Sequence, residues 1–385
     1  MLSFKLALKN LLGAGLRTWL NVIVLSIAYV VIIWHYGLLD GWNRQAHRDT
    51  INWQIGGGQY WHQNYDQYDP FTLDDSHSKI PEKLNTSEFA SILITQSTIY
   101  PEGRMKSVLL KGINPDQKVI ELPSQLLTTK SEAIPAIIGK NLARNSKLKS
   151  GDLVTVRWRD VNGTFDAAEL QIINVFDCNV PAMDAGQVWI PLNRLQEMMQ
   201  LPGEATIITV PQNYSAQKIE FFEFKDHDFL LHEIREIIKQ KRVGGSIIYI
   251  ILLSLAMLAI FDTQILSIFR RQKEIGTNIA LGMTRGQVIT IFTIEGALNS
   301  VLAAIVGAIY GIPLLATQAI HGFEMPGSSE DYGMAIAQIT YPYYSVGLIF
   351  TTILIVVVVA TIVSFIPTRK IAKMKPTDAI RGKIQ

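Results

Sequence analysis

The chain has 385 residues, of which 48% are hydrophobic and 18% are charged, and its formal net charge is +2. This composition is too apolar for an ordinary soluble protein and is typical of a chain that lies partly in a membrane. The small net charge gives no reason to expect nucleic-acid binding, and the single cysteine, Cys178, excludes an internal disulfide and a zinc site of the Cys-x-x-Cys kind.

The chain begins with a short basic segment that precedes its first apolar stretch. In "FKLALKNLL", Lys5 and Lys9 are four residues apart, so they share one face of a helix and leave the leucines on the other. This pattern predicts an amphipathic helix that lies on the membrane surface. The apolar stretch that follows, 18–40, ends without a small-residue cleavage site, which favours an uncleaved membrane anchor over a signal peptide.

Residues 41–243 predict a large globular domain of mixed α+β structure. "LVTVRWRDVNGTFDAAELQIINVF" alternates apolar and polar residues on both sides of an Asn-Gly turn, so it predicts a hairpin. "IIGKNLARNSKLKSGD" predicts a short helix closed by Gly151. "QVWIPLNRLQEMM" predicts a strand and then a helix with Pro191 near its start. The aromatic loop "GGGQYWHQNYDQYDP" is expected to be packed, with ligand binding as the alternative.

The sequence contains no motif for catalysis or for a cofactor. Its seven histidines are scattered and form no helical pair of metal ligands. It also has no Gly-x-Ser-x-Gly motif and no Gly-x-x-x-x-Gly-Lys-Ser/Thr phosphate-binding loop. We therefore expect a chain that is not an enzyme and that holds no metal.

Two helical segments are expected to connect the outer domain to the membrane. The first span continues through the helix-compatible residues "GLLDGWNRQAHRD", and "FLLHEIREIIKQKR" runs into the second span with only Gly244-Gly245 as an interruption. We expect both segments to form stalk helices, with a simple connector as the alternative. The apolar face of the second stalk consists of Leu230, Ile234, Ile237 and Ile238.

Three further apolar stretches bring the expected number of membrane spans to four. Lys and Arg are concentrated before the first span, between the second and third, and after the fourth, whereas the loop 317–342 is acidic and has neither. Because cytoplasmic segments carry the excess of basic residues, both termini are expected in the cytoplasm. The expected segments are a cytoplasmic amphipathic segment (1–17), span one (18–40), the outer domain (41–243), span two (244–269), a cytoplasmic helix (270–286), span three (287–316), the acidic outer loop (317–342), span four (343–366) and a basic cytoplasmic tail (367–385).

Polar and small residues inside the spans are further candidates for function. Asp262 lies about 12 Å from the end of the second span, where a carboxylate is unfavourable and is therefore expected to be functional. It either pairs across a subunit interface or, as we favour, lies in a zone that water reaches. Glu295 is expected at the membrane interface. Ala303, Gly307 and Gly311 repeat every four residues and predict close helix packing.

The break between the second and third spans has the pattern of a short helix. Ile275 and Ile279 fall on one side of it, and Gly282 is a typical terminating residue. A short cytoplasmic helix between two spans is a suitable contact for a soluble protein that pushes on its membrane partner.

The residues of this region resemble those of a known family. "RRQKEIGTNIALGMTRGQVITIFTIEGAL" is similar to the signature of ABC transporter permeases of the FtsX/MacB/LolC-LolE superfamily, in which R-x-x-E-I-G-x-x-x-A-L-G precedes an E-G pair. The tail "PTRKIAKMKPTDAIRG" resembles the tail of the same family. In the outer domain, "LLKGINPDQ" and "AIIGKNLARNSKLKSGD" resemble the lipoprotein-releasing branch.

The resemblance implies a permease of the inner membrane with a MacB-like periplasmic core between its first two spans. It implies two permease subunits, identical or paralogous, and two separate ABC ATPase subunits that bind ATP and magnesium. Hydrolysis would then move the stalks and do work in the periplasm, which is called mechanotransmission. Carried over by position, the ATPase-coupling residues are Arg271, Glu274, Ile275, Gly276, Ala280, Leu281 and Gly282. Glu274 is expected to pair either with a basic residue of the ATPase or locally with Arg270 or Arg271.

The function that follows from the resemblance is the release of lipoproteins from the inner membrane toward a periplasmic carrier. One alternative is a MacB-type efflux permease that works with a periplasmic adaptor and transports a hydrophobic substrate. The other is an FtsX-like division regulator that activates a cell-wall hydrolase.

Overall fold

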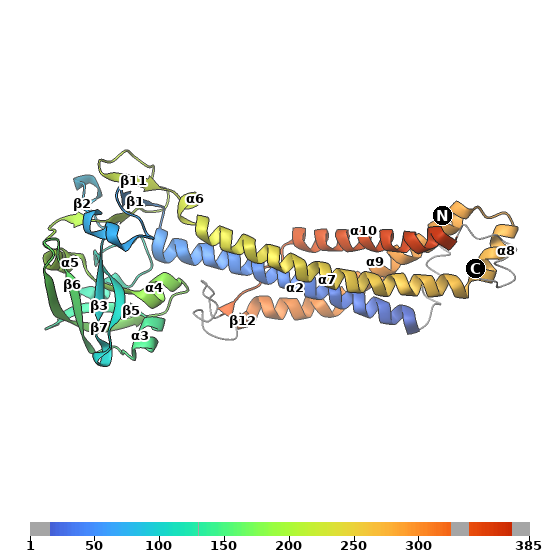
Figure 1. Ribbon diagram of the computed structural model, residues 1–385, viewed down its shortest axis with the longest axis horizontal. Coiled ribbons are helices and arrows are strands. Elements are labelled where there is room, and N and C mark those ends of the chain that lie inside the picture. The colour runs from blue at the N-terminus through green and yellow to red at the C-terminus, as the bar shows by residue number, and fades with distance from the viewer. Residues whose placement is uncertain (1–15, 130, 325–338, 372–385) are drawn as a thin grey trace. The chain divides into compact units, whose positions relative to one another are not determined.

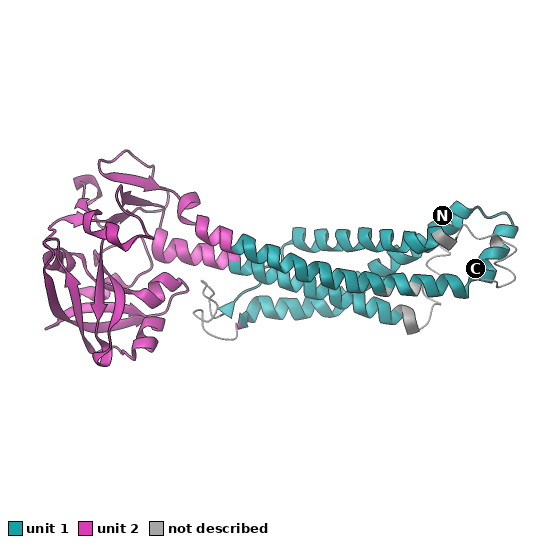
Figure 2. Cartoon of the chain, in the orientation of Figure 1, with its two compact units in different colours: residues 1–42, 238–323, 339–385 teal, residues 43–237, 324–338 magenta. Residues whose placement is uncertain are grey.

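The computed structural model describes residues 16–129, 131–324 and 339–371 (Figure 1). The chain divides into two compact units (Figure 2). Unit 1 consists of residues 1–42, 238–323 and 339–385, and unit 2 consists of residues 43–237 and 324–338. Two long helices, α2 (Leu16–Thr50) and α7 (His232–Arg270), each contribute residues to both units.

Unit 1 is helical. Besides its parts of α2 and α7 it contains α8 (Gln272–Ala280), α9 (Arg285–His321) and α10 (Val346–Ile371), with a short strand pair of β12 (Phe323–Glu324) and β13 (Ile339–Thr340). Four of the helices, α2, α7, α9 and α10, are long and apolar enough to cross a membrane by length and composition, which confirms the prediction at that level. Much of their apolar surface is exposed, as expected for helices that face lipid or a partner.

The helices extend beyond several of the predicted segment bounds. Residues 317–321, expected in the outer loop, form the last turn of α9, and α10 continues to residue 371. The amphipathic segment up to residue 15, the loop residues 325–338 and the tail from residue 372 lie outside the described residues, so the structure does not describe these predicted segments.

The core of unit 1 lies where four helices meet. It contains Leu25 and Tyr29 of α2, Met257 of α7, Ala303 of α9 and Ala360 of α10, all of which are buried. Tyr29 Oη and Ser300 Oγ are 2.8 Å apart, which adds a hydrogen bond between α2 and α9. The core residues are therefore a mixture of large and small side chains in which the small ones permit close helix approach.

The small residues of α9 face α2. A Cβ atom placed on Gly307 would lie 3.3 Å from the backbone oxygen of Ser26, and one on Gly311 would lie 2.6 Å from Val30 Cγ2. Ala303, one turn earlier, has no exposed surface. Larger side chains at these positions would force the two helices apart.

Unit 2 contains a nine-stranded sheet in the order β11-β1-β10-β3-β4-β8-β5-β7-β6. Because β6 also pairs with β3, six strands from β3 to β6 close into a ring and form a small barrel. The remaining strands β10, β1 and β11 extend the sheet from β3. The strands of this sheet are β1 (Gln59–His62), β3 (Ala90–Ile99), β4 (Lys106–Ile113), β5 (Ile134–Gly139), β6 (Leu153–Arg159), β7 (Phe165–Phe176), β8 (Gln187–Pro191), β10 (Ile207–Thr209) and β11 (Phe222–Lys225).

The two faces of the barrel wall carry separate apolar cores. The inner core includes Leu110, Val156 and Ile172 and is covered by the helices α3 (Lys140–Ser146) and α5 (Leu192–Met199). The outer core includes Trp189 and Ile137 and lies beneath α4 (Pro181–Gly186) and several loops. In β3 and β4 alternate residues therefore supply alternate cores, whereas the outward residues of β6 are exposed.

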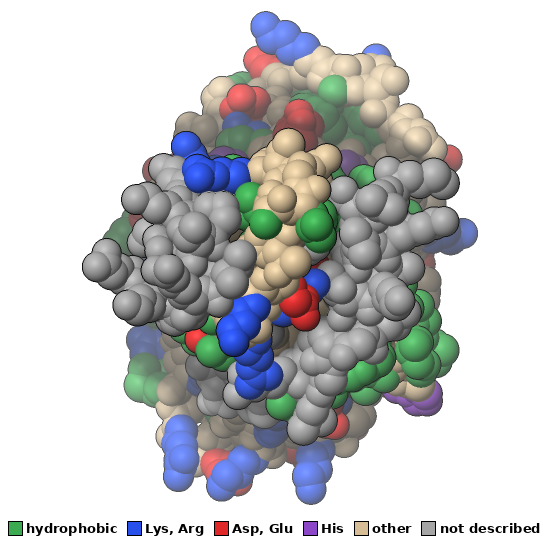
Figure 3. All heavy atoms as spheres, turned by 90° about the vertical axis from the view of Figure 1, so that its right-hand side faces the viewer, with side chains coloured by type: hydrophobic (Ala, Val, Ile, Leu, Met, Phe, Trp, Pro, Cys, Tyr) green, Lys and Arg blue, Asp and Glu red, His purple; other side chains and the backbone are tan. Residues whose placement is uncertain are grey.

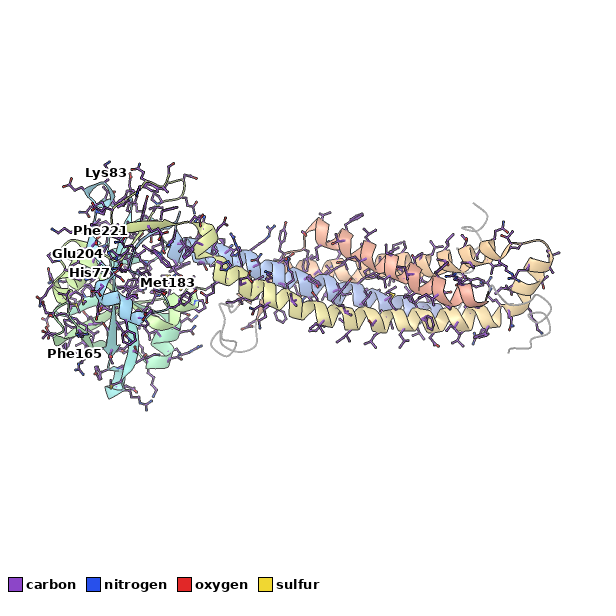
Figure 4. The ribbon with its side chains drawn as sticks, turned by 45° about the horizontal axis from the view of Figure 1, so that its top comes forward. His77, Lys83, Phe165, Met183, Glu204 and Phe221 are labelled. Carbon is purple, nitrogen blue, oxygen red and sulfur yellow. The ribbon has the colours of Figure 1, made fainter. Side chains whose placement is uncertain are left out.

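A smaller ladder completes unit 2. It pairs β2 (Ser78–Lys79) with β9 (Glu204–Ala205), and His77 Nδ1 lies 2.6 Å from Glu204 Oε2 (Figure 4). The neighbouring His62 Nε2 lies 3.1 Å from Ser78 Oγ. Burial lowers the pKa of His62, so this imidazole favours its neutral form.

Two of the local predictions for unit 2 are confirmed and two are corrected: the predicted aromatic loop contains β1, which pairs with β10 and β11, and the end of α3 differs. β6 and β7 form the predicted antiparallel hairpin, and its turn places Gly163 at φ +82°. β8 is followed by α5 with Pro191 at its N-cap, as predicted. The helix α3, however, ends at Lys147, which is left-handed at φ 55°. Gly151 instead lies in the turn before β6, so it does not close the helix.

The two predicted stalks differ in how far they are helical. The extension of the first span is confirmed, because α2 runs to Thr50 and continues as a π-helical turn to Ile55. The second stalk was predicted to be continuous from Leu230, and this is wrong. Leu230 belongs to the short helix α6 (His227–Leu230), the chain bends at Leu231, and α7 begins at His232. Ile234, Ile237 and Ile238 of α7 are half-buried or buried.

Lys111 is an unusual member of the outer core of unit 2. It occupies the centre of β4, where its strand neighbours are Ile94 and Trp189, and only 7% of its surface is exposed. Its Nζ lies 5.2 Å from the ring centroid of Trp189, a cation–π contact. Because burial disfavours the ammonium, the pKa of Lys111 falls to about 8.

The lowered pKa predicts how unit 2 responds to pH. Below pH 8 both the folded and the unfolded chain carry the charge, and folding must desolvate it. Between about pH 8 and 10.5 the folded protein binds fewer protons than the unfolded protein, so its stability rises with pH. Replacing Lys111 by Met should raise the free energy of unfolding at pH 7 by at most about 3 kcal/mol, since one pKa unit corresponds to about 1.4 kcal/mol.

The measurement is protease resistance of unit 2 in the full-length protein in nanodiscs, from pH 7 to pH 10. Lys118→Met, on an exposed lysine, is the matched control and should change nothing at either pH. If Lys111→Met and the unaltered protein show the same dependence of protease resistance on pH, the ammonium of Lys111 is already well solvated or paired in the folded protein.

Candidate coupling site

The segment between α7 and α9 forms a compact cap at one end of unit 1. α7 ends at Arg270, the backbone turns at Arg271, and the nine residues of α8 follow. After α8, Gly282 adopts φ +106°, a left-handed conformation that glycine adopts without strain. Thr284 and Gln287 then form a capping box that starts α9. The end of α8 and the start of α9 therefore each have a local cause in the sequence.

One face of α8 packs against α9. Ile275 is 7% exposed and lies in an apolar cluster with Ile268 of α7 and with Val288 and Phe292 of α9. Ile279 packs partly against the same cluster. This contact orients α8 and determines which of its residues remain on the outside.

Arg271 joins the cap to α9 through charge. Its Nη1 lies 3.4 Å from Glu295 Oε2, and its Nε lies 3.1 Å from Glu274 Oε2. The guanidinium also lies over Phe292, with its Cζ 5.2 Å from the ring centroid. The side chain of Glu295 is only 7% exposed, whereas that of Glu274 is 67% exposed. The guanidinium of Arg271 therefore pairs with one buried and one exposed carboxylate.

The outer face of the cap is an exposed surface of mixed chemistry. Leu281, at the end of α8, is 81% exposed, and the side chain of Glu274 is also largely accessible. Figure 3 views unit 1 from the side of α8 and shows basic and acidic side chains next to hydrophobic ones there. The other exposed residues of this surface are Lys273, Thr277, Ala280 and Gly282. This surface therefore offers both a charged and an apolar side chain to a partner.

The structure separates the predicted coupling residues into two groups. Glu274, Ala280, Leu281 and Gly282 are exposed. Ile275 and Gly276 are buried, and Arg271 is half-buried against α9. The first group is available for a partner in this arrangement, and the second supports it from inside. The proposed contact of each residue with an ATPase stays a prediction.

The structure also shows where the polar residues of the predicted spans lie. Asp262 is exposed on α7, and both of its expected environments, a subunit interface and a hydrated zone, stay predictions. Glu295, expected at the membrane interface, is buried and paired with Arg271. Sequence reasoning named both residues of this pair without joining them, because 24 residues separate them and helical periodicity relates only near neighbours.

A close crossing of three helices lies beside Glu295 and was not predicted. A Cβ atom on Gly296 of α9 would overlap Ser364 Oγ of α10 and lie 3.2 Å from Gln264 Nε2 of α7. All three residues are buried. The E-G pair in the sequence was the available signal, since a glycine in a helix lowers stability unless close packing needs it. Across the described part of the chain, no group of three or more His, Cys, Asp or Glu is arranged to hold a metal ion.

Comparison with known proteins supports a permease. Residues 246–376, which contain α8, match the family described as FtsX-like permease C-terminal. An uncharacterized ABC transporter permease, MJ1507 of Methanocaldococcus jannaschii, is 26% identical over 167 residues. That similarity covers 42% of this chain and 39% of the relative, so it spans less than half of the relative's length.

These two matches support an ABC transporter permease of the FtsX-like superfamily. Among solved structures, the extracellular domain of the noncanonic ABC-type transporter YknZ from Gram-positive bacteria matches 41% of this chain and 84% of its own, at 14% identity and a TM-score of 0.26.

The crossing at Gly296 predicts a packing requirement. Gly296→Ala should destabilise the helical bundle by about 1–3 kcal/mol, because the added methyl group overlaps Ser364 and forces α9 and α10 apart. Adding Ser364→Gly should restore part of the loss. The measurement is the midpoint of thermal unfolding in nanodiscs.

The matched control is Gly286→Ala in the first turn of α9, where the nearest atom, Thr284 Oγ1, is 4.0 Å from the added Cβ. This variant should be neutral or slightly stabilising. Equal midpoints for Gly296→Ala and Gly286→Ala would contradict the close crossing.

Proposed function

We propose that this chain is the membrane subunit of an ABC-type mechanotransmission transporter of the inner membrane. The observation that carries the proposal is the exposed cap at α8, which lies between two membrane-length helices within the region that matches the FtsX-like permease family. In the proposed complex this cap receives the ATPase.

In this proposal the energy source is a separate subunit. The sequence contains no phosphate-binding loop, so ATP and magnesium would be held by two ATPase subunits, one at the cap of each permease. Leu281 would supply the apolar contact and Glu274 the charged one. A second permease, identical or paralogous, completes the proposed assembly.

In this proposal α2 and α7 transmit the movement of the cap. α2 and α7 contain no proline, and each passes from unit 1 into unit 2 as one hydrogen-bonded helix. Within unit 1 they are joined by the ion pair of Asp40 and Arg242, and a Cβ atom on Gly245 would lie 2.5 Å from His35 Nε2. A displacement of the cap would therefore move α2 and α7 together.

The work is proposed to be the release of lipoproteins from the inner membrane toward a periplasmic carrier. The support is the resemblance of two segments of unit 2 to the lipoprotein-releasing branch. One is "LLKGINPDQ", which covers the end of β4 and the turn after it, and the other is "AIIGKNLARNSKLKSGD", which covers β5 and α3. In this proposal unit 2 lies in the periplasm and both chain termini lie in the cytoplasm.

The proposed topology predicts opposite accessibility for two exposed residues. With Cys178 replaced by Ala, a membrane-impermeant thiol reagent should label Asn162→Cys in intact spheroplasts and should label Thr277→Cys only after lysis. Cys178 itself is buried and is the only native thiol, so the background is low. Labelling of Thr277→Cys in intact cells would refute the proposed orientation.

The proposed ATPase contact predicts a specific loss of binding. Leu281→Asp should weaken association of the co-purifying ATPase at least tenfold, because it places a charge at the apolar centre of the interface. Gly282→Val should do the same by straining the left-handed turn. The measurement is the dissociation constant with the permease in nanodiscs.

Glu274→Lys reverses the exposed charge and should also weaken binding. Leu153→Asp, which introduces the same negative charge as Leu281→Asp at a residue of unit 2 that is 57% exposed, is the control for Leu281→Asp and should bind normally. Normal binding by Leu281→Asp, Gly282→Val and Glu274→Lys together would remove the cap from the proposed interface.

A further inference from the structure

Glu295 is a carboxylate in a helix long and apolar enough to span a membrane, and its side chain is 7% exposed. A buried carboxylate is stable only when a cation or hydrogen-bond donors compensate it. Arg271 supplies such a cation from the bend between α7 and α8, 3.4 Å away. The pair therefore ties the cap to α9, and loss of Arg271 would remove a cation from beside a buried carboxylate.

Arg271 lies between α7 and α8, so its ion pair with Glu295 affects the orientation of α8. The N–H of Arg271 donates to the carbonyl of Ser267 in α7, and its own carbonyl accepts from the N–H of Ile275 in α8. The residue thus belongs to the hydrogen bonding of both helices while its side chain reaches α9 over Phe292. A change in the orientation of this side chain would alter the angle between α8 and α9.

The same guanidinium also pairs with Glu274 on the exposed surface. A basic group of a partner that binds Glu274 would compete with Arg271 for this carboxylate. Arg271 would then be left to Glu295, and the pair that holds α8 on α9 would tighten.

We propose that Arg271 is the positioning residue of the coupling site: it holds α8 on α9 through Glu295, and it transmits the capture of Glu274 by a partner to α9. This inference rests on the proposed function, because it assigns the internal step that follows ATPase binding. Arg271 acts inside the permease, so its loss affects coupling more than binding.

The first test needs no ATPase. A nitroxide label is placed at Leu281→Cys in the full-length chain in nanodiscs, with Cys178 replaced by Ala, and its mobility is measured by electron paramagnetic resonance. Arg271→Ala and Glu295→Gln should each increase the mobility of the label, because α8 loses its charged tie to α9. Arg271→Lys keeps the charge and should retain most of the immobilisation. Glu274→Gln releases Arg271 from its exposed partner, as capture of Glu274 would, and should leave the label at least as immobile as in the unaltered chain.

The second test uses the ATPase that co-purifies with the unaltered chain, and the chain without a label. Arg271→Ala and Glu295→Gln should keep its dissociation constant within about threefold, while permease-stimulated hydrolysis falls at least tenfold. The reversed pair Arg271→Glu with Glu295→Arg should recover at least a third of that stimulation.

The outcomes separate the inference from the proposed function. Unchanged label mobility in both Arg271→Ala and Glu295→Gln, or full stimulation by both variants, would overturn the role of Arg271. A change of mobility as predicted, in a chain that binds no ATPase, would instead overturn the proposed function and leave the tie between α8 and α9 established.

Discussion

Close helix packing at the small residues of α9 is the constraint on which unit 1 depends. In a membrane the hydrophobic effect does not drive helices together, so association relies on tight van der Waals contact and on polar contacts between helices. Gly307 and Gly311 bring α9 close to α2, and Gly296 brings it against α7 and α10. The hydrogen bond between Tyr29 and Ser300 is possible only because these backbones approach closely.

The cap at α8 packs against α9, which this close helix packing holds in place. Because α9 is held by three neighbours, its first turns offer a firm surface on which Ile275 can pack and to which Arg271 can bind. The apolar contact of Ile275 positions α8. The ion pairs of Arg271 make this position sensitive to charge, since a guanidinium between two carboxylates responds to any new charge near the exposed carboxylate. A surface suited to a partner and a contact suited to transmit its binding thus lie on the same nine-residue helix and the residues that flank it.

Unit 2 solves a different packing problem. A sheet that closes through the pairing of β3 with β6 has an interior of its own, and the helices α3 and α5 complete that inner core. The outer face of the wall is a second core and contains Lys111 beside Trp189. A buried ammonium reduces stability at neutral pH, and its presence shows that this core is not optimised for stability alone.

The sequence alone determined the features that depend on local physics. Length and apolarity predicted four membrane-length helices, alternation with an Asn-Gly turn predicted the hairpin of β6 and β7, and the left-handed preference of glycine predicted the turn at Gly282. Each of these follows from residues within one continuous segment of the chain. The end of α3 was misjudged because Lys147 adopts the left-handed conformation that was expected at a glycine. The break at Leu231 was also missed, since no proline or glycine marks it.

Only the tertiary structure decided which distant residues meet. Arg271 and Glu295 were both recognised as charged residues near the ends of spans, but their pairing depends on the angle at which α8 folds onto α9. That angle depends on the packing of Ile275 of α8 with Phe292 of α9, and the crossing at Gly296 holds α9 against α7 and against α10, which is distant in the chain. Hydrophobic periodicity indicates which face of a helix is buried, but it carries no information about which other helix covers that face.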